Sequence, residues 1–166
     1  MMQLPSAIWH ALLAATHAHP AWRERLLAWQ SQRNATTLHL AILREPYLSR
    51  ILTGRKRIES RFGRDRRAPF GQVQASDLLL LKRAGGPLAG LALVKHAISR
   101  EITPADAHEL HAAYADDLAI DDPHWRELHI RSRYVTLIWL DDVYPLPPIP
   151  LPRRDRRGWV VVKKIE

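Results

Sequence analysis

The sequence contains no cysteine, which excludes disulfide bonds, thiolate zinc sites and a cysteine nucleophile, and which is typical of a reducing cytosol. It also has no apolar run that approaches the roughly 20 residues needed to cross a bilayer. The N-terminal segment lacks a basic start and carries His10, His17, His19 and Pro20, so it does not resemble a signal peptide. A chain of 166 residues, 46% of them hydrophobic, is long enough to build one core. We therefore expect a single cytoplasmic unit that makes no membrane contact.

The patterns of common cofactor and catalytic sites are missing as well. Gly85-Gly86 precedes a proline and opens no helix, so it predicts a hairpin turn rather than a phosphate-binding loop. His108 and His111 lack the i, i+4 spacing of a zinc protease helix, and the other histidines are scattered. Ser60 is not flanked by the glycines of a nucleophile elbow. The sequence therefore predicts no metal and no cofactor.

Acidic residues are in the minority, with 17 Asp and Glu against 25 Lys and Arg, and the formal net charge is +8. This balance favours a polyanionic partner. A general bias toward arginine would produce the same charge by decorating the surface, but it would not cluster the basic residues. They gather in three loops, namely Arg55 to Arg67, Lys82-Arg83, and Arg153-Arg154 with Arg156-Arg157.

Hydrophobic periodicity predicts helices and strands in mixed order. Two helices broken at Pro20 are expected within Pro5 to Arg33, and the stripe of Trp22, Leu26 and Trp29 is expected to dock on the rest of the protein, with a partner surface as the alternative. Further helices are expected at Pro46 to Thr53 and from Thr103 and Asp122 onward. Strands are expected at Leu38 to Leu43, Arg57 to Phe62, Leu78 to Leu81, Leu88 to Ile98, Tyr134 to Leu140 and Trp159 to Val162, with an extended connector at Pro145 to Pro152.

The stretch from Gly54 to Arg61 carries the densest charge at a predicted boundary between elements. Gly54 stands where a left-handed helix C-cap belongs. Because side chains alternate along a strand, Glu59 and Arg61 share one face, roughly 7 Å apart, and the bend turns Lys56 toward the same side. This pattern suits a ligand-binding site. The alternative is structural, with Lys56 at the negative end of the preceding helix and an ordinary surface pair between Glu59 and Arg61.

These residues match the G-x-K-x-x-E-x-R signature of ASCH domains, and the order of elements from Leu38 to Val162 also resembles that family. The resemblance implies an α+β fold of the PUA-like superfamily, a mixed β-barrel with surrounding helices and a cleft that the charged residues face. Residues 1–36 would form an N-terminal helical extension and residues 37–166 the ASCH domain.

The resemblance also implies a function. ASCH domains are proposed to bind RNA, some small bacterial members are amidohydrolases that act on acetylated cytidine, and ribonuclease activity has been proposed for others. The catalytic lysine of the amidohydrolase type corresponds to Lys56, but this chain has Glu59 where that type has its threonine nucleophile. This departure argues against the amidohydrolase mechanism.

We therefore expect a module that binds RNA or a nucleotide through a basic cleft. The alternative is a hydrolase that acts on a modified nucleoside or on RNA, with Lys56 and Glu59 as its catalytic residues. The candidate binding residues are Lys56, Glu59, Arg61, Arg64, Arg66, Arg67, Lys82, Arg83, Arg153, Arg154, Arg156 and Arg157.

Overall fold

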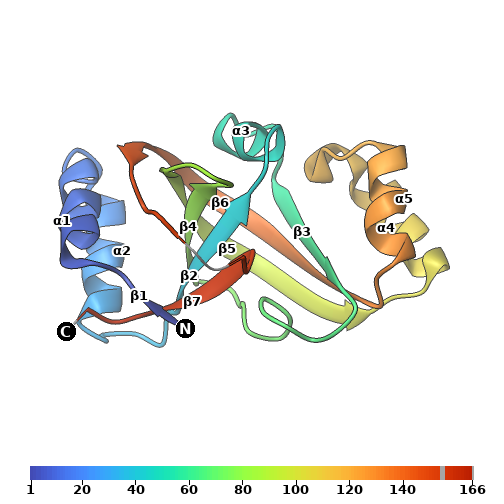
Figure 1. Ribbon diagram of the computed structural model, residues 1–166, viewed down its shortest axis with the longest axis horizontal. Helices are drawn as coiled ribbons and strands as arrows, with labels where there is room; N and C mark the ends of the chain where they lie inside the picture. The colour runs from blue at the N-terminus through green and yellow to red at the C-terminus, as the bar shows by residue number, and fades with distance from the viewer. Residues whose placement is uncertain (154–155, 166) are drawn as a thin grey trace.

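The computed structural model describes residues 1–153 and 156–165, which form one mixed sheet and five helices. Figure 1 shows the sheet in the middle of an elongated molecule, with α1 and α2 at one end and α4 and α5 at the other. The elements are β1 (Met2–Gln3), α1 (Ser6–Ala15), α2 (Pro20–Gln30), β2 (Leu38–Leu43), α3 (Tyr47–Leu52), β3 (Ile58–Gly63), β4 (Leu78–Arg83), β5 (Leu88–Glu101), α4 (Pro104–Leu118), α5 (Asp122–Ile130), β6 (Tyr134–Ile149) and β7 (Trp159–Lys163). No helix within the described residues is long and apolar enough to span a membrane.

The seven strands are ordered β1-β7-β2-β4-β5-β6-β3. The pairs β1–β7 and β2–β4 are parallel, and the other neighbouring strands are antiparallel. Helices and strands are interspersed without a regular βαβ period, so the predicted α+β class is confirmed.

Strands β2 and β4 are buried on both faces because apolar side chains alternate between two cores. Leu78 and Leu80 pack in the core beneath α1 and α2, whereas Leu79 and Leu81 pack in the core beneath α3. The predicted burial of Leu78 to Leu81 on both faces is therefore confirmed. A third apolar cluster lies between α4, α5, β3 and β6.

The N-terminal helices dock on the sheet, as the stripe of apolar residues predicts. Trp22, Leu26 and Trp29 are at most 1% exposed and belong to the same core as β2 and β4, so this face is not available to a partner protein. The indole nitrogen of Trp22 donates to the carbonyl of Asp142 on β6 (3.0 Å), and Arg25 forms an ion pair with the carboxylate of the same residue.

Strands β6 and β1 differ most from the sequence-based expectation, and β4 and β5 continue past their predicted ends to Arg83 and Glu101. Strand β6 continues to Ile149 and takes in the first half of the predicted proline-rich connector. The prolines are tolerated in the strand because this part of β6 pairs with β5 on one side only. The other neighbour, β3, pairs with β6 only from Tyr134 to Trp139. The two-residue β1 has too little sequence for a periodic pattern and was not predicted.

Arg61 connects opposite sides of the sheet. The described strand pairings do not join the end strands β1 and β3. The guanidinium of Arg61 on β3 nevertheless donates to the carbonyl of Ile42 on β2 (2.8 Å) and to that of Gly158 immediately before β7 (3.1 Å). The sheet is therefore curled like a partly open barrel, and Arg61 holds its free edge to the strands across the gap.

Candidate functional site

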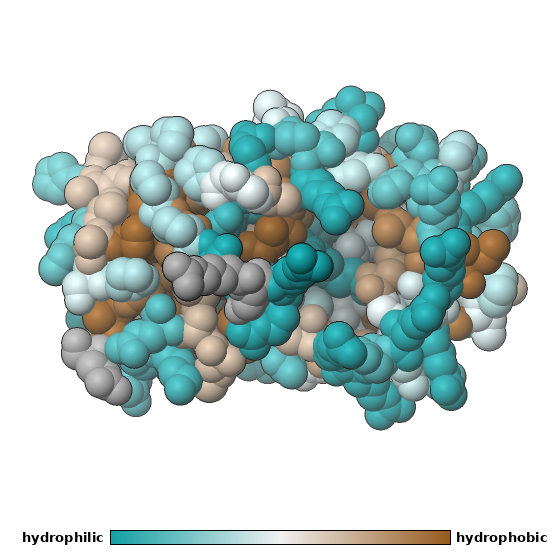
Figure 2. Space-filling model, in the orientation of Figure 1, coloured by the Kyte–Doolittle hydropathy of each residue, from teal (hydrophilic) through white to brown (hydrophobic). Residues whose placement is uncertain are grey.

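A cleft of about 1380 Å³ opens beside β3. Its described walls come from the end of β2 and the start of α3, from β3, from the end of β4 and the turn before β5, from α5, and from the end of β6 with the segment that joins it to β7. Figure 2 shows this face of the molecule hollowed to the right of centre, between strongly hydrophilic side chains. The predicted motif runs along one side of the cleft, because Glu59, Ser60 and Arg61 all line it.

The turn between α3 and β3 directs Lys56 into the protein. Gly54 has a φ of +80°, a left-handed conformation that other residues adopt only with strain, so its predicted place at the helix C-cap is confirmed. The backbone nitrogen of Lys56 then donates to the carbonyl of Arg50 (2.9 Å). The Lys56 side chain is fully buried, and its ammonium donates to the carbonyl of Leu118 (2.6 Å).

Lys56 belongs to a set of donors that covers the C-terminal end of α4. The last carbonyls of a helix have no partners within the helix and carry partial negative charge. Here Leu118 accepts from Lys56, Asp117 accepts from the backbone of Arg57 (2.8 Å), and Ala119 accepts from the guanidinium of Arg50 (2.7 Å). The Lys56 ammonium thus complements the negative end of α4 rather than that of the preceding helix α3.

The charged residues of the motif form a row from the interior to the cleft. The ammonium of Lys56 lies 3.9 Å from one carboxylate oxygen of Glu59, and the guanidinium of Arg61 lies 3.4 Å from the other. The side chains of Lys56, Glu59 and Arg61 are 0%, 9% and 20% exposed, so this is not a surface pair. Burial lowers the pKa of Lys56, and the charge of Glu59 offsets only part of that effect. Lys56 is thus enclosed behind Glu59, and Glu59 itself faces the cleft.

The lowered pKa of Lys56 makes the stability of the protein depend on pH. In the unfolded chain lysine titrates near 10.5, so between its lower folded pKa and that value the unfolded state binds more protons and the free energy of unfolding rises with pH. We expect the free energy of unfolding of the wild type, minus that of Lys56→Met, to become more positive as the pH rises through this window. Urea unfolding at several pH values measures both free energies. Lys163→Met, at an exposed position on β7, is the control and should show no such trend. A difference that is constant with pH would contradict the assignment.

The cleft also has an aromatic side that the sequence analysis did not identify. The rings of Tyr47 and His124 are stacked, with centroids 5.3 Å apart and 13° between their planes. Both residues line the cleft. Burial raises the pKa of Tyr47, with a further contribution from Asp121, so the phenol keeps its proton at neutral pH. The only sign of this aromatic side in the sequence was a tyrosine next to the proline at the start of α3. Its contact with α5 could be seen only in the folded structure.

Ser60, another residue that lines the cleft, carries an unsatisfied hydroxyl. Its side-chain oxygen is buried and has no hydrogen-bond partner among the described residues. Buried polar groups in proteins are almost always paired, so each exception calls for an explanation. Because this oxygen is shielded from solvent, a ligand in the cleft could pair with it only after the Ser60 side chain rotates.

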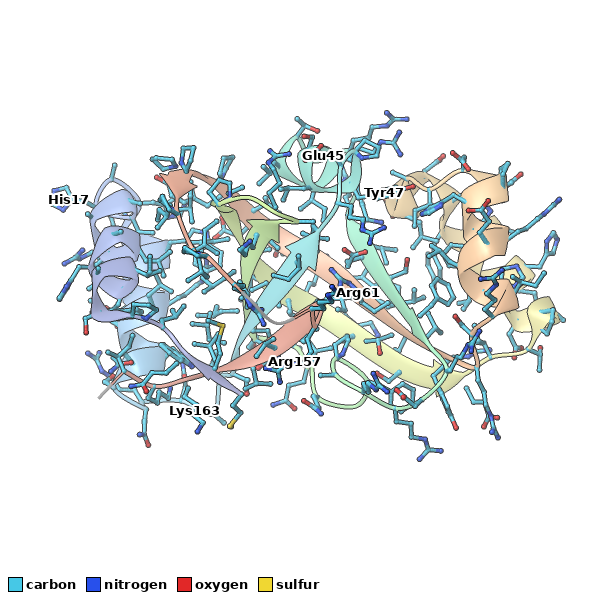
Figure 3. All side chains as sticks on the ribbon, in the orientation of Figure 1. His17, Glu45, Tyr47, Arg61, Arg157 and Lys163 are labelled. Carbon is cyan, nitrogen blue, oxygen red and sulfur yellow. The ribbon has the colours of Figure 1, made fainter. Side chains whose placement is uncertain are left out.

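The predicted basic residues divide into three groups. Lys82 lines the cleft, where burial and the nearby charge of Arg153 lower its pKa. Three described arginines of the segment between β6 and β7, Arg153, Arg156 and Arg157, line it as well. Figure 3 shows Arg157 and Arg61 near the centre of the view with Tyr47 above them. The predicted binding residues that line the cleft are Glu59, Arg61, Lys82, Arg153, Arg156 and Arg157.

The second group lies around a neighbouring hollow, and the third lies away from both. Arg64 and Arg67 line the neighbouring hollow, and Arg66 packs on aromatic rings beside it. Arg83 forms an ion pair with Glu45 (2.5 Å) and is not among the residues found to line either hollow. Arg154 lies outside the described residues.

The histidines form no metal site in the part of the chain that the structure describes, where no group of three potential ligands occurs. The fully buried His39 has a structural role. Its two ring nitrogens contact the carboxylate of Asp77 (3.0 Å) and the indole nitrogen of Trp159 (3.1 Å), which ties β2 to β7 and to the loop before β4.

The structure is similar to that of the ASCH protein from Zymomonas mobilis. The match has a TM-score of 0.63 and 17% sequence identity, and it covers 76% of this chain and 88% of the other. Two variants of the Zymomonas mobilis protein match with the same TM-score and cover 91% and 89% of their chains. The sequence matches no family model and no curated protein. The similarity establishes a shared fold, while the identity is too low to transfer the role of any residue.

Proposed function

We propose that this chain, which has the ASCH fold, binds single-stranded RNA or a nucleotide in the cleft beside β3. The observation that carries the proposal is the composition of the cleft, which combines a carboxylate with stacked rings and several cations. Cations attract phosphates, aromatic faces stack on bases, and a few polar groups read base edges. This combination suits a nucleotide better than it suits a purely acidic or a purely apolar ligand.

The size of the cleft favours a ligand larger than one nucleotide. Pockets for small molecules usually enclose about 300–1,000 Å³. The cleft beside β3 exceeds that range. A short stretch of RNA fits these dimensions, with its phosphates near Arg153, Arg156 and Arg157 and one base near the Tyr47–His124 stack.

Glu59 is the proposed reader of the base. Its carboxylate accepts from the backbone nitrogen of Ser60 (2.8 Å) and contacts the cations on either side, so its position is fixed before any ligand arrives. A fixed acceptor selects a base with an exposed amino group. Lys56 is enclosed, and we therefore assign it a positioning role that acts through Glu59.

We expect the protein to bind an unstructured RNA oligonucleotide with an affinity that falls steeply with salt. The slope of log K against log salt concentration should be about −0.7 for each phosphate contacted. Glu59→Gln should weaken binding about tenfold, because it exchanges the fixed acceptor for an amide. Arg156→Gln should weaken it for all sequences alike and reduce the slope by about one contact.

Fluorescence anisotropy with a labelled oligonucleotide measures both effects. Arg33→Gln is the matched control, since Arg33 is exposed in the segment after α2 and is not among the residues found to line the cleft. Circular dichroism melting should first show that each variant is folded. Affinity that neither Glu59→Gln nor Arg156→Gln changes would move the binding site away from this cleft.

A hydrolase is the second candidate, and one observation favours it. Lys56 has a lowered pKa and lies 3.9 Å from a carboxylate that faces the cleft, an arrangement that can hold and move protons around an attacking water. This candidate predicts turnover of a modified cytidine, or cleavage of RNA in the presence of a chelator, that Glu59→Gln abolishes. Binding without any product across such substrates would decide against it.

A further inference from the structure

A second hollow of about 410 Å³ adjoins the main cleft. Arg61, Phe62 and Gly158 line both, so the two hollows meet at the guanidinium that holds the sheet edge. The second hollow extends from there along the loop that follows β3 and reaches Tyr134 at the start of β6. Its volume lies in the range of a site for one small ligand.

An aromatic pair forms part of the wall of the second hollow. The rings of Phe70 and Tyr134 are 5.2 Å apart and nearly perpendicular, and both residues are half-buried. The guanidinium of Arg66 lies 5.8 Å from the first ring and 5.3 Å from the second. Aromatic rings and arginine planes are the surfaces on which unpaired bases stack.

Three arginines, Arg61, Arg64 and Arg67, also line the second hollow, among small and apolar residues. The one acid among its described lining residues is Asp65, which already pairs with Arg67 (2.8 Å). The hollow therefore has positive charge beside its aromatic pair, the same combination as the main cleft.

We infer that the second hollow binds the nucleotide next to the one in the main cleft, so that the ligand is a single-stranded oligonucleotide that passes over Arg61. This inference rests on the proposed function of the main cleft. The second base packs against Phe70 and Tyr134, and the phosphate between the two nucleotides faces Arg61. A duplex does not fit, because its bases remain paired and stacked and cannot turn into two separate hollows.

The protein, residues 1–166, should be titrated with cytidine monophosphate and with unstructured cytidine-containing RNA of two, four and eight nucleotides, by calorimetry and anisotropy. The wild type should bind the tetranucleotide at least tenfold more tightly than the mononucleotide. Phe70→Ala should lower affinity for the tetranucleotide about tenfold, the usual cost of losing one stacking partner. It should leave affinity for the mononucleotide unchanged.

Arg66→Gln provides a second variant with a smaller expected loss, because its side chain is exposed and packs on the rings from outside. Arg33→Gln controls for the removal of one positive charge. Equal affinity for all lengths, in the wild type and in Phe70→Ala, would overturn the inference and leave the proposed function intact. If Phe70→Ala and Arg66→Gln both kept the preference for longer RNA, the additional nucleotides would bind elsewhere. That result would also overturn the inference. Equally tight binding of a polyglutamate peptide would overturn the nucleic-acid assignment, and absence of binding at every length would remove the proposed function as well.

Discussion

Replacing Arg61 by alanine is expected to lower the free energy of unfolding by about 3 kcal/mol and to weaken RNA binding at the same time. The guanidinium donates to two carbonyls across the opening of the curled sheet, and hydrogen bonds to a charged group are worth about 1.5–3 kcal/mol each. It also lies over the ring of Trp159 (5.3 Å) and contacts Glu59. Because these contacts share one side chain, their contributions are not additive, and the expected loss is less than their sum.

Arg61→Lys separates geometry from charge. Lysine keeps the positive charge but lacks the planar fork that reaches Ile42 and Gly158 together, so we expect it to recover less than half of the lost stability. Arg33→Gln is the control for removal of one arginine charge, because Arg33 is exposed and its only ion pair among the described residues, with Glu24, is exposed too, so stability should change by less than about 1 kcal/mol. Urea unfolding monitored by tryptophan fluorescence gives the stabilities. If Arg61→Ala were as stable as the wild type, the contact across the sheet would have no structural importance.

The fold follows from the sequence wherever the determinants are local. Gly54 fixes the end of α3 through its backbone freedom, and the capping box of Thr103 and Asp106 fixes the start of α4. The spacing of apolar residues predicted all five described helices and every described strand except β1. The predicted boundaries differ from the structure mainly where a strand continues past its run of apolar residues. The motif with the order of elements then indicated the ASCH fold, which the structural comparison confirms.

The candidate site was only partly accessible from the sequence, because its contacts join distant segments. Glu59 and Arg61 lie together through strand alternation, which the sequence predicts. Lys56 meets the carbonyl of a residue 62 positions away, so nothing local could show that it is enclosed beneath the cleft. Tyr47 and His124 come from the starts of two different helices, and the stack exists only because the sheet brings those helices together.

Removing Glu59 should reveal how strongly it is coupled to Lys56. Glu59→Ala leaves a buried ammonium with one carbonyl partner and no counter-charge, and breaking a buried ion pair in this way typically costs about 3–5 kcal/mol. We expect a loss near the lower end, about 3 kcal/mol, because the two charges are 3.9 Å apart and the cleft admits water to the vacated position.

The double variant Lys56→Met with Glu59→Ala should be more stable than Glu59→Ala alone, since methionine fills the buried space without a charge. A double-mutant cycle at pH 7 by urea unfolding should give a coupling free energy of about 1–3 kcal/mol. Asp65 with Arg67 offers the matched control, because both members of that pair are exposed and their coupling should be below about 1 kcal/mol. If the Lys56–Glu59 coupling were equally small, the Glu59 carboxylate would not depend on Lys56 for its position. The positioning role assigned to Lys56 would then be wrong.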